Sequence, residues 1–312
     1  MLKVGLVGVG GISGVHIQAW EKYENAQLTS ICDIRPERFE RYPDKKHYTD
    51  FDEMLASEKF DIIDICLPTF LHTEFALKCL EKGINVICEK PISLKKEDVD
   101  LIYNTAKENG VKFMVAQVLR FWPEYEFVKQ VYDDKRYGKL LTGRMSRLGA
   151  YPKWSWDSWY TDEKRSGLVP FDLHIHDLDF MVYAFGSPKV ERSLKIKNDT
   201  NYYMNNIYDF GDFSVIADAS WYSVPYPFKM EFSFEFEEAI VAMEDGYFKV
   251  YESNGKVIDL RASDKCEGDV SIPQGDAYYK EIEYFANCVI NDIWPDKVKA
   301  EELKTVIDIL NK

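Results

Sequence analysis

The sequence has few cysteines, and no two of them are closely spaced. Its six cysteines never form a Cys-x-x-Cys pair, which excludes a zinc ribbon or a redox pair of that kind. Scattered thiols in a chain of 312 residues are typical of a reducing compartment, so we expect a cytoplasmic protein. The six are Cys32, Cys66, Cys79, Cys88, Cys266 and Cys288.

Long apolar runs and an excess of positive charge are also missing. No run reaches the roughly 18 apolar residues of a membrane-spanning helix, and the apolar segment 4–12 is short and glycine-rich, which disfavours a signal peptide. Lys and Arg total 39 against 53 Asp and Glu, giving a net charge of −14. Nucleic acids and anionic membranes require clustered positive charge, so neither is expected as a partner.

The first 118 residues alternate between apolar runs and amphipathic helical patterns. The apolar runs are nearly continuous, which is typical of strands that are buried on both faces. They cover residues 2–7, 28–32, 61–67, 84–88 and 111–118. The alternation predicts an α/β fold with a doubly wound parallel sheet and helices on both faces.

The pattern changes near residue 119. Longer strand-like runs follow, and 228–236 alternates apolar with mostly charged residues, as in a sheet with one wet face. Helices are predicted over 123–131 and 173–185, and two more close the chain. At roughly 150 residues per domain, this length predicts two domains, 1–118 and 119–312.

A glycine-rich turn joins the first predicted strand to a helix. Gly8 permits a tight turn, and Gly10 lets a pyrophosphate approach the backbone and the helix N-terminus. Ser13 stands where Gly or Ala is usual, and it is still small. Asp33 follows at the distance of about 20 residues expected of a ribose-binding acid. The alternative is a plain glycine turn beside a solvated Asp33.

The acid at position 33 favours NAD over NADP. The Asp33 carboxylate would accept a hydrogen bond from the ribose 2′-hydroxyl and would repel a 2′-phosphate. Arg35 keeps NADP open as an alternative, because its guanidinium could hold that phosphate.

Two segments carry residues suited to acid–base chemistry. Lys90 follows a predicted strand, where ligands bind in open parallel sheets, and Pro91 stiffens its loop. Asp172 and His176 are four residues apart, so a helix places them on one face. His176 could take an alcohol proton, Asp172 could orient it, and Lys90 could stabilise alkoxide charge. The alternatives are a surface Lys90, a structural His176, and a metal site at His174-x-His176.

Three motifs together carry a family resemblance that covers the whole chain. They are the glycine turn, the sequence Cys88-Glu89-Lys90-Pro91, and the helix with Gly167, Asp172, His176, Asp177 and Asp179. The segment Tyr278-Tyr279-Lys280-Glu281…Phe285 also looks like a Tyr-x-x-Glu segment of the same family. The chain resembles the glucose–fructose oxidoreductase / inositol dehydrogenase / MocA family.

The resemblance implies a Rossmann domain over 1–118 and a C-terminal α+β domain over 119–312. The second domain would have a large, open, mostly antiparallel sheet that binds substrate and mediates oligomerisation. The implied activity is NAD(P)-dependent oxidation of a sugar, cyclitol or related polyol, with His176 as acid/base and Lys90 and Asp172 assisting. The residues expected to bind the cofactor are Gly8, Gly10, Gly11, Ile12, Ser13, Asp33, Arg35, Leu67, Thr69, His72, Glu89 and Lys90.

Two departures from the family pattern concern the substrate more than the chemistry. A single Gly167 stands where relatives carry two or three glycines, and His174 replaces a small residue. Aromatic residues with Arg side chains nearby suit a polyol pocket, although each could equally be a core or subunit contact. The residues expected to bind substrate are Lys90, Arg120, Trp159, Asp172, His176 and Tyr278.

The broad sheet predicts a homodimer or homotetramer, because its apolar face requires a partner. Two other functions remain open besides the dehydrogenase. One is a hydrolase or epimerase that retains its NAD and oxidises the sugar only transiently. The other is a non-catalytic dinucleotide sensor, which would not need the set Lys90, Asp172 and His176.

Overall fold

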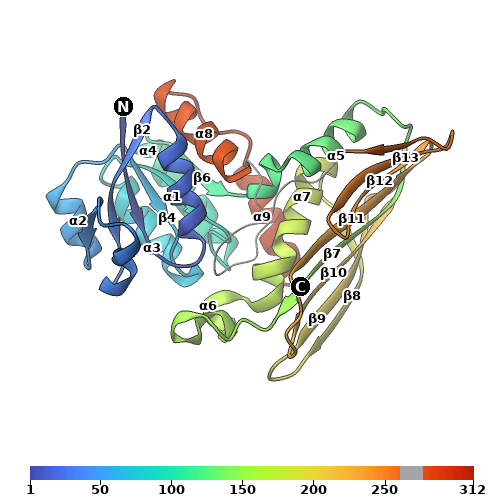
Figure 1. Ribbon diagram of the computed structural model, residues 1–312, viewed down its shortest axis with the longest axis horizontal. Helices are drawn as coiled ribbons and strands as arrows, with labels where there is room; N and C mark the ends of the chain where they lie inside the picture. Colours follow the sequence, from blue (N-terminus) through green and yellow to red (C-terminus); the bar gives the residue numbers. More distant parts are fainter. Residues whose placement is uncertain (261–276) are drawn as a thin grey trace. The chain divides into compact units, whose positions relative to one another are not determined.

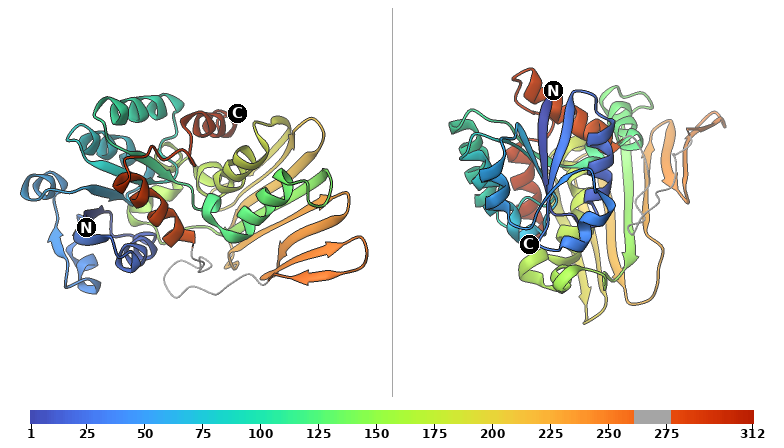
Figure 2. Two further views of the ribbon diagram at one scale, coloured as in Figure 1. Left: turned by 90° about the horizontal axis from the view of Figure 1, so that it is seen from above. Right: turned by 60° about the vertical axis from the view of Figure 1, so that its left-hand side comes forward.

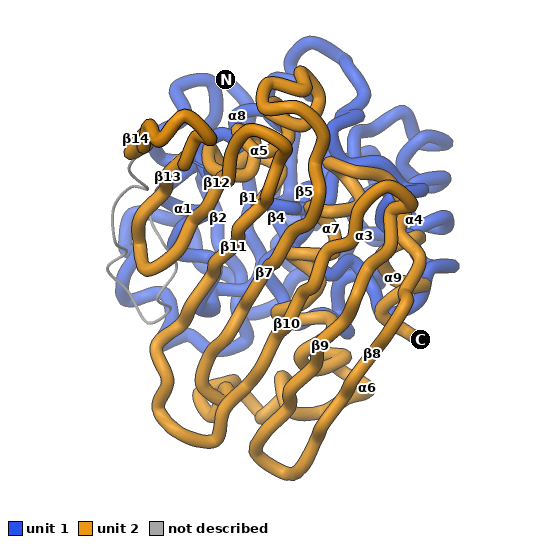
Figure 3. The backbone as a smooth tube through the Cα atoms, turned by 90° about the vertical axis from the view of Figure 1, so that its right-hand side faces the viewer, with its two compact units in different colours: residues 1–118, 276–304 blue, residues 119–275, 305–312 orange. Residues whose placement is uncertain are grey.

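The computed structural model, which describes residues 1–260 and 277–312, divides the chain into two units. The first unit consists of residues 1–118 and 276–304, and the second of 119–275 and 305–312 (Figure 3). The sequence pattern assigns everything after residue 118 to one domain, whereas the described residues 277–304 pack with the first unit. Cys266 lies outside the described residues.

Six parallel strands form the sheet of the first unit, in the order β3-β2-β1-β4-β5-β6. This arrangement confirms the predicted parallel sheet. The strands are β1 (Leu2–Val7), β2 (Ala26–Cys32), β3 (Lys46–Tyr48), β4 (Ile62–Ile65), β5 (Asn85–Glu89) and β6 (Phe113–Ala116). Periodicity did not indicate β3, because this three-residue edge strand has no apolar run.

Helices cover both faces of this sheet, as Figure 2 shows in its right-hand view. Helix α1 packs against α8, and α3 packs against α4. The Tyr23 hydroxyl after α1 donates to Asn287 Oδ1 at 2.8 Å, which links α8 to this unit. The helices are α1 (Ser13–Lys22), α2 (Phe51–Ser57), α3 (Thr69–Leu80), α4 (Lys96–Glu108) and α8 (Ala277–Ile290), with a 3-10 turn η1 (Pro36–Arg41).

The second unit contains an eight-stranded sheet in the order β14-β13-β12-β11-β7-β10-β9-β8, seen face-on in Figure 3. Only β7 and β10 pair in parallel, so the predicted mostly antiparallel sheet is confirmed. The strands are β7 (Leu140–Ala150), β8 (Lys189–Lys197), β9 (Tyr202–Asp209), β10 (Ser214–Tyr222), β11 (Lys229–Phe236), β12 (Ala239–Glu244), β13 (Tyr247–Glu252) and β14 (Val257–Asp259).

Helices α5 and α7 lie against one face of that sheet (Figure 1). Aromatic rings make the contact: Tyr125 meets Phe232 edge-on at 5.0 Å, and Phe180 lies 6.3 Å from Phe234. The helices are α5 (Pro123–Asp133), α6 (Glu163–Ser166), α7 (Ile175–Phe185) and α9 (Ala300–Leu310), with 3-10 turns η2 (Val118–Phe121) and η3 (Trp156–Thr161) and a π-helical turn η4 (Pro170–His174). Within the described residues, every helix is too short or too polar to span a membrane.

A buried carboxylate ties three neighbouring strands of the first sheet together. Glu58, just after α2, is 3% exposed at its side chain. It accepts hydrogen bonds from Lys3 at 2.7 Å, Ser30 at 2.6 Å, Tyr48 at 2.9 Å and Lys46 at 3.0 Å. Burial alone would raise the pKa of Glu58, but these hydrogen bonds outweigh it and lower the pKa from 4.5 to about 2.

We therefore predict that Glu58 stabilises the fold above pH 4.5 and that this contribution disappears as the pH falls towards 2. The reason is that the unfolded chain binds the Glu58 proton more readily than the folded one. In urea unfolding experiments, the difference in the free energy of unfolding between wild type and Glu58→Gln should be smaller at pH 3 than at pH 5. Glu108→Gln, at an exposed site, is the control. A difference that stays constant with pH would contradict the prediction.

Candidate functional site

Four of the predicted site segments follow strands of the first sheet. Gly8 follows β1, Asp33 follows β2, Leu67 follows β4, and Lys90 follows β5. Because all six strands are parallel, their carboxyl ends meet at one edge, which is where open α/β sheets bind ligands. The structure therefore brings these four segments to the same edge.

The glycine turn has the space that a dinucleotide phosphate needs. Gly8 has φ +92°, and a Cβ atom there would lie 2.6 Å from the Cys66 carbonyl oxygen, so glycine is required on both counts. A Cβ at Gly10 would meet nothing within 4 Å. Ser13 is the first residue of α1, and its hydroxyl donates a hydrogen bond to the Gly10 carbonyl at 2.9 Å. Gly11 and Ile12 complete this turn, which fits a pyrophosphate at the helix N-terminus.

Asp33, which is buried, and Arg35, which is partly exposed, form one ion pair beside the turn. The Asp33 carboxylate accepts from Arg35 Nε at 2.9 Å and Nη2 at 3.0 Å, and from the Val9 amide at 2.8 Å. Asp33 thus joins the second strand to the glycine turn, and Arg35 sits on the same carboxylate. Asp33, which favours NAD, and Arg35, which keeps NADP open, are therefore direct neighbours.

The residues after β4 surround a buried histidine. His72 lies with Nδ1 2.8 Å from the Pro91 carbonyl and Nε2 2.6 Å from the Leu67 carbonyl. Burial lowers the pKa of His72, while its two carbonyl partners act in the opposite direction. Thr69 is buried at the start of α3. His72 therefore links the loop after β4 to the loop after β5, and its role towards a cofactor stays a prediction.

Lys90 is held at its main chain by the side chain of its neighbour. The Lys90 amide donates to Glu89 Oε2 at 3.0 Å, while the other carboxylate oxygen, Oε1, lies 3.0 Å from His16 Nε2. His16 also contacts Asp64 on β4 at 2.9 Å. The sequence analysis missed His16 and Asp64. Asp64 carried a signal, since it is the one charged residue within Ile62-Ile63-Asp64-Ile65.

In the second unit, Asp172 and His176 share the accessible side of one helical segment. Asp172 lies in the π-helical turn and His176 in the first turn of α7. Within 171–180 all other residues are buried, and only these two are partly exposed. The predicted helix over 173–185 is present, and it is extended by a π-helical turn, which often occurs at functional sites.

The segment before this turn is bent sharply. Gly167 has φ +73°, and a Cβ atom there would lie 2.4 Å from the Phe171 ring. Leu168 also has positive φ, +57°, which is unfavourable for a residue with a side chain. Its side chain is buried among Val169, Leu173 and Trp221. A leucine with positive φ is thus anchored in the core directly after Gly167.

Two buried ion pairs fasten α7 to the rest of its unit. Asp177 accepts from Arg147 on β7 at 2.7 Å, and Asp179 accepts from Arg120 at 2.6 and 2.9 Å. Arg120 is 0% exposed. The sequence analysis expected Arg120 to bind substrate hydroxyls. The structure instead directs its guanidinium to Asp179, a partner that was not visible because it lies 59 residues away.

His174 faces the sheet and not the side that carries His176. Its Nε2 lies 2.6 Å from the Tyr208 hydroxyl and 3.2 Å from Asn206 Nδ2. Burial lowers the pKa of His174 to about 3, so the ring is neutral at ordinary pH. The geometry therefore does not support a metal bound between His174 and His176, because His174 Nε2 is directed at Tyr208 and Asn206 on β9. His174 anchors the π-helical turn to β9.

The aromatic residues predicted near the substrate occupy two different places. Trp159 stacks on Tyr160 at 4.0 Å, and Trp154 meets Tyr160 edge-on at 5.3 Å, all in the second unit. Trp159 is partly exposed. Tyr278, in contrast, is buried on α8 of the first unit, with its ring 6.0 Å from that of His16.

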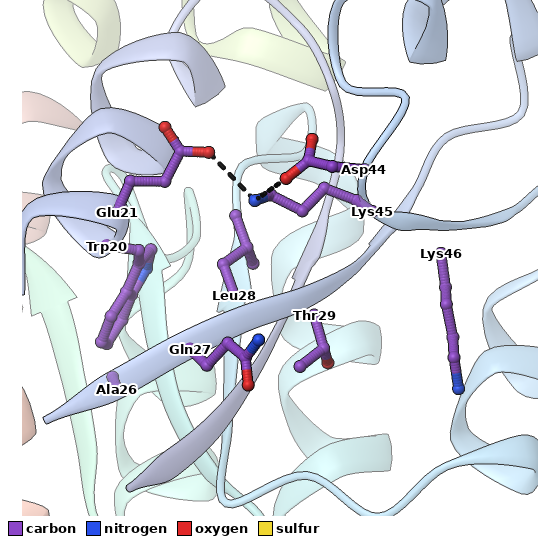
Figure 4. A pocket seen from close by; sticks show the side chains of 9 residues that line it. All are labelled: Trp20, Glu21, Ala26, Gln27, Leu28, Thr29, Asp44, Lys45 and Lys46. Atoms are coloured by element: carbon purple, nitrogen blue, oxygen red, sulfur yellow. Dashed lines mark hydrogen bonds and ion pairs between the residues drawn. The ribbon is translucent and has the colours of Figure 1, made fainter. Parts of the chain in front are cut away.

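A hollow of about 370 Å³ on the first unit lies apart from these residues. It is lined by the first residues of β2 together with Trp20, Glu21, Asp44, Lys45 and Lys46 (Figure 4). Lys45 binds Glu21 at 3.0 Å and Asp44 at 2.7 Å across it. None of the predicted site residues lines this hollow, so it is not the candidate site.

Comparison with known proteins gives two family matches. Residues 2–117 match the family described as "Oxidoreductase family, NAD-binding Rossmann fold", and residues 125–236 match the "GFO/IDH/MocA C-terminal domain". In structure, the chain is similar to levoglucosan dehydrogenase in complex with NADH and levoglucosan, with a TM-score of 0.84 at 17% identity, covering 99% of this chain and 95% of that one. At that identity the likeness shows the fold alone.

Two curated relatives align with part of the chain. The glucose-6-phosphate 3-dehydrogenase of Bacillus subtilis is 27% identical over 208 residues, 64% of this chain and 59% of its own length. The 2,7-anhydro-N-acetylneuraminate hydratase of Mediterraneibacter gnavus is 29% identical over 184 residues, 58% of this chain and 48% of its own. The matched region thus spans about half to three-fifths of these relatives.

We predict that Asp33→Ala weakens NAD binding by about 10- to 100-fold, the cost of losing a hydrogen bond to a charged group. The variant should also show a smaller preference for NAD over NADP. Arg35→Ala is the matched variant, since it keeps the carboxylate and removes its ion-pair partner. It should leave NAD binding intact and weaken NADP. Titration of each variant with NAD and NADP by calorimetry measures both effects. Unchanged NAD affinity in Asp33→Ala would mean that the ribose is held elsewhere.

Proposed function

Because this chain belongs to the GFO/IDH/MocA oxidoreductase family and has its NAD-binding Rossmann domain, we propose that it oxidises a secondary alcohol of a sugar, cyclitol or related polyol. The observation that carries the proposal is the pair Asp172 and His176. They are the partly exposed polar residues of a helical segment whose other side chains are buried from 171 to 180.

His176 acts as the acid/base in this proposal. Oxidation of an alcohol carbon requires loss of the hydroxyl proton, and imidazole exchanges protons near neutral pH. Asp172, one turn earlier, orients the ring and favours its charged form. Lys90 supplies a positive charge that stabilises the oxygen as negative charge develops on it. The proposal requires all three side chains to reach one substrate carbon.

The first unit holds the dinucleotide in this proposal. Gly8, Gly10 and Ser13 form the pyrophosphate turn, and Asp33 binds the ribose. Bound NAD supplies the hydride acceptor at the substrate carbon. The remaining residues proposed to line the cofactor are Gly11, Ile12, Arg35, Leu67, Thr69, His72 and Glu89.

On the substrate side, Trp159 offers an aromatic face for the C–H groups of a sugar ring. Tyr278 is not included, since it is buried in the first unit beside His16. We further propose a cytoplasmic homodimer or homotetramer that assembles through the wide sheet of the second unit.

A second candidate is a reaction without net oxidation. One relative bears the name of a hydratase, and addition of water leaves the cofactor unchanged overall. In that case the same residues move the proton, while NAD stays bound between turnovers.

The test is the absorbance of reduced nicotinamide when the protein is mixed with NAD or NADP and a panel of sugars, inositols and sugar acids. We expect reduced cofactor to accumulate with at least one polyol. If none reacts in either direction while calorimetry shows NAD binding, the dehydrogenase proposal fails. Mass spectrometry of the same mixtures then shows whether water has been added to or removed from a sugar.

We predict that His176→Ala and Lys90→Ala each lower kcat by about 10²- to 10⁴-fold, the range for removing an acid/base or a charge-stabilising group. Binding of NAD should change by less than about threefold, because neither loss removes the phosphate turn. His47→Ala, at an exposed position on β3, is the control. Near-normal kcat in either variant would remove that residue from the proposed mechanism.

A further inference from the structure

A cluster of ionisable side chains is buried in the first unit next to Lys90, and the proposed reaction gives no role to three of its four members. Its members come from four elements: His16 on α1, Asp64 on β4, Glu89 on β5 and Glu281 on α8. His16, Asp64 and Glu281 are 0% exposed, and Glu89 is 7% exposed. Burial of so many charged groups is costly unless they are paired, so the arrangement requires an explanation.

The His16 ring bridges two carboxylates. Its Nδ1 lies 2.9 Å from Asp64 Oδ2, and its Nε2 lies 3.0 Å from Glu89 Oε1. Carboxylate oxygens are hydrogen-bond acceptors, so this geometry suits a ring that donates from both nitrogens. Burial would lower the pKa of His16, but the charge of Asp64 and its hydrogen bond keep that pKa well above 6.5.

These contacts favour a hydrogen-bonded cluster over a metal site. Donor atoms of His16, Asp64 and Cys66 do lie within 4.8 Å of one another. However, both His16 nitrogens are already directed at carboxylates, so neither presents a lone pair. The Cys66 thiol lies 3.5 Å from Asp64 Oδ1, and burial raises the pKa of this thiol, which disfavours the thiolate that a metal needs.

Glu281 faces the same cluster but makes no hydrogen bond to its members. Among the described residues, neither of its carboxylate oxygens has a hydrogen-bond partner. Burial, and then the nearby charge of Glu89, raise the pKa of Glu281 well above 4.5. The His16 ring is therefore hydrogen-bonded to Asp64 and Glu89 and not to a third carboxylate.

The cluster ends at the main chain of Lys90. Glu89 Oε1 contacts His16, and Glu89 Oε2 accepts from the Lys90 amide at 3.0 Å. The other end is anchored, because Asp64 also accepts from Trp20 Nε1 at 2.8 Å. A continuous series of hydrogen bonds thus runs from Asp64 through His16 and Glu89 to the backbone of Lys90.

We propose that His16 is a positioning residue that orients the Glu89 carboxylate and thereby fixes the backbone from which the Lys90 side chain extends. The inference rests on the proposed function, in which Lys90 stabilises charge on the substrate oxygen. A displacement of about 1 Å at a reacting group can lower the rate about 100-fold, so a fixed backbone at Lys90 matters for turnover.

Two substitutions at position 16 distinguish the hydrogen bond of Nδ1 from that of Nε2. The amide nitrogen of His16→Gln can reach the place of Nε2 and donate to Glu89, whereas that of His16→Asn can reach only the place of Nδ1, next to Asp64. We expect His16→Asn to lower kcat about 10- to 100-fold, with little change in the KM for NAD. His16→Gln should retain several times more activity than His16→Asn. The matched control is His47→Gln on the exposed edge strand β3.

A purely structural role predicts a different pattern. It would lower the melting temperature of both variants and reduce kcat equally, or leave kcat unchanged. Either result would overturn the proposal. If His16→Asn does not fold, Glu89→Gln serves instead, because an NH₂ group replaces one of the two carboxylate oxygens and the donor that faced that oxygen, either His16 Nε2 or the Lys90 amide, loses its acceptor. That variant should also lose kcat, and full activity would overturn the proposal.

Amide hydrogen exchange of the full chain without NAD gives a readout that does not depend on turnover. We expect the Lys90 amide to exchange faster in His16→Asn and in Glu89→Gln than in wild type, with His16→Gln between them. If wild type oxidises no polyol but this order appears, the proposed function fails and the positioning stands. If wild type is active and Lys90 exchanges equally in all variants, the positioning fails and the proposed function stands.

Discussion

Parallel strands end at one edge of a sheet, and the chemistry available to the first unit depends on that constraint. Six strands of the same direction bring the glycine turn, Asp33, the Leu67 loop and Lys90 to this edge, although 82 residues separate Gly8 from Lys90. No single segment could bind a dinucleotide alone. Together they offer a helix N-terminus, an acid and a cation along one border.

Buried charge then determines how these segments are held. In the first unit, the buried His16 contacts the Glu89 carboxylate next to Lys90. Glu58 joins the neighbouring strands β1, β2 and β3. In the second unit, Arg147 and Arg120 bind Asp177 and Asp179 on α7. Breaking one partner of such a pair leaves an uncompensated charge, so each pair strongly constrains its helix. Asp172 in the preceding π-helical turn and His176 on α7 stay partly exposed.

The fold was largely predictable because its signals are local. Apolar runs and helical spacing are properties of neighbouring residues, and they indicated β1, β2, β4, β5 and β6 together with α1, α3 and α4 but not α2. The short strand β3 escaped because three residues carry no periodicity. The π-helical turn over 170–174 also escaped, since its i+5 pairing follows from the bend at Gly167 and Leu168 and from the contact of His174 with β9.

The candidate site was predictable only in part. The sequence by itself determined the residue types and the alternating pattern that place Gly8, Asp33 and Lys90 after strands, because strand direction and turn chemistry are encoded within short segments. Tertiary structure alone decided that Arg120 binds Asp179, that Tyr278 lies beside His16, and that His16 stands between two carboxylates. The partners in these contacts are 48 or more residues apart in the sequence. Which residues meet depends on which face of each helix packs against a sheet.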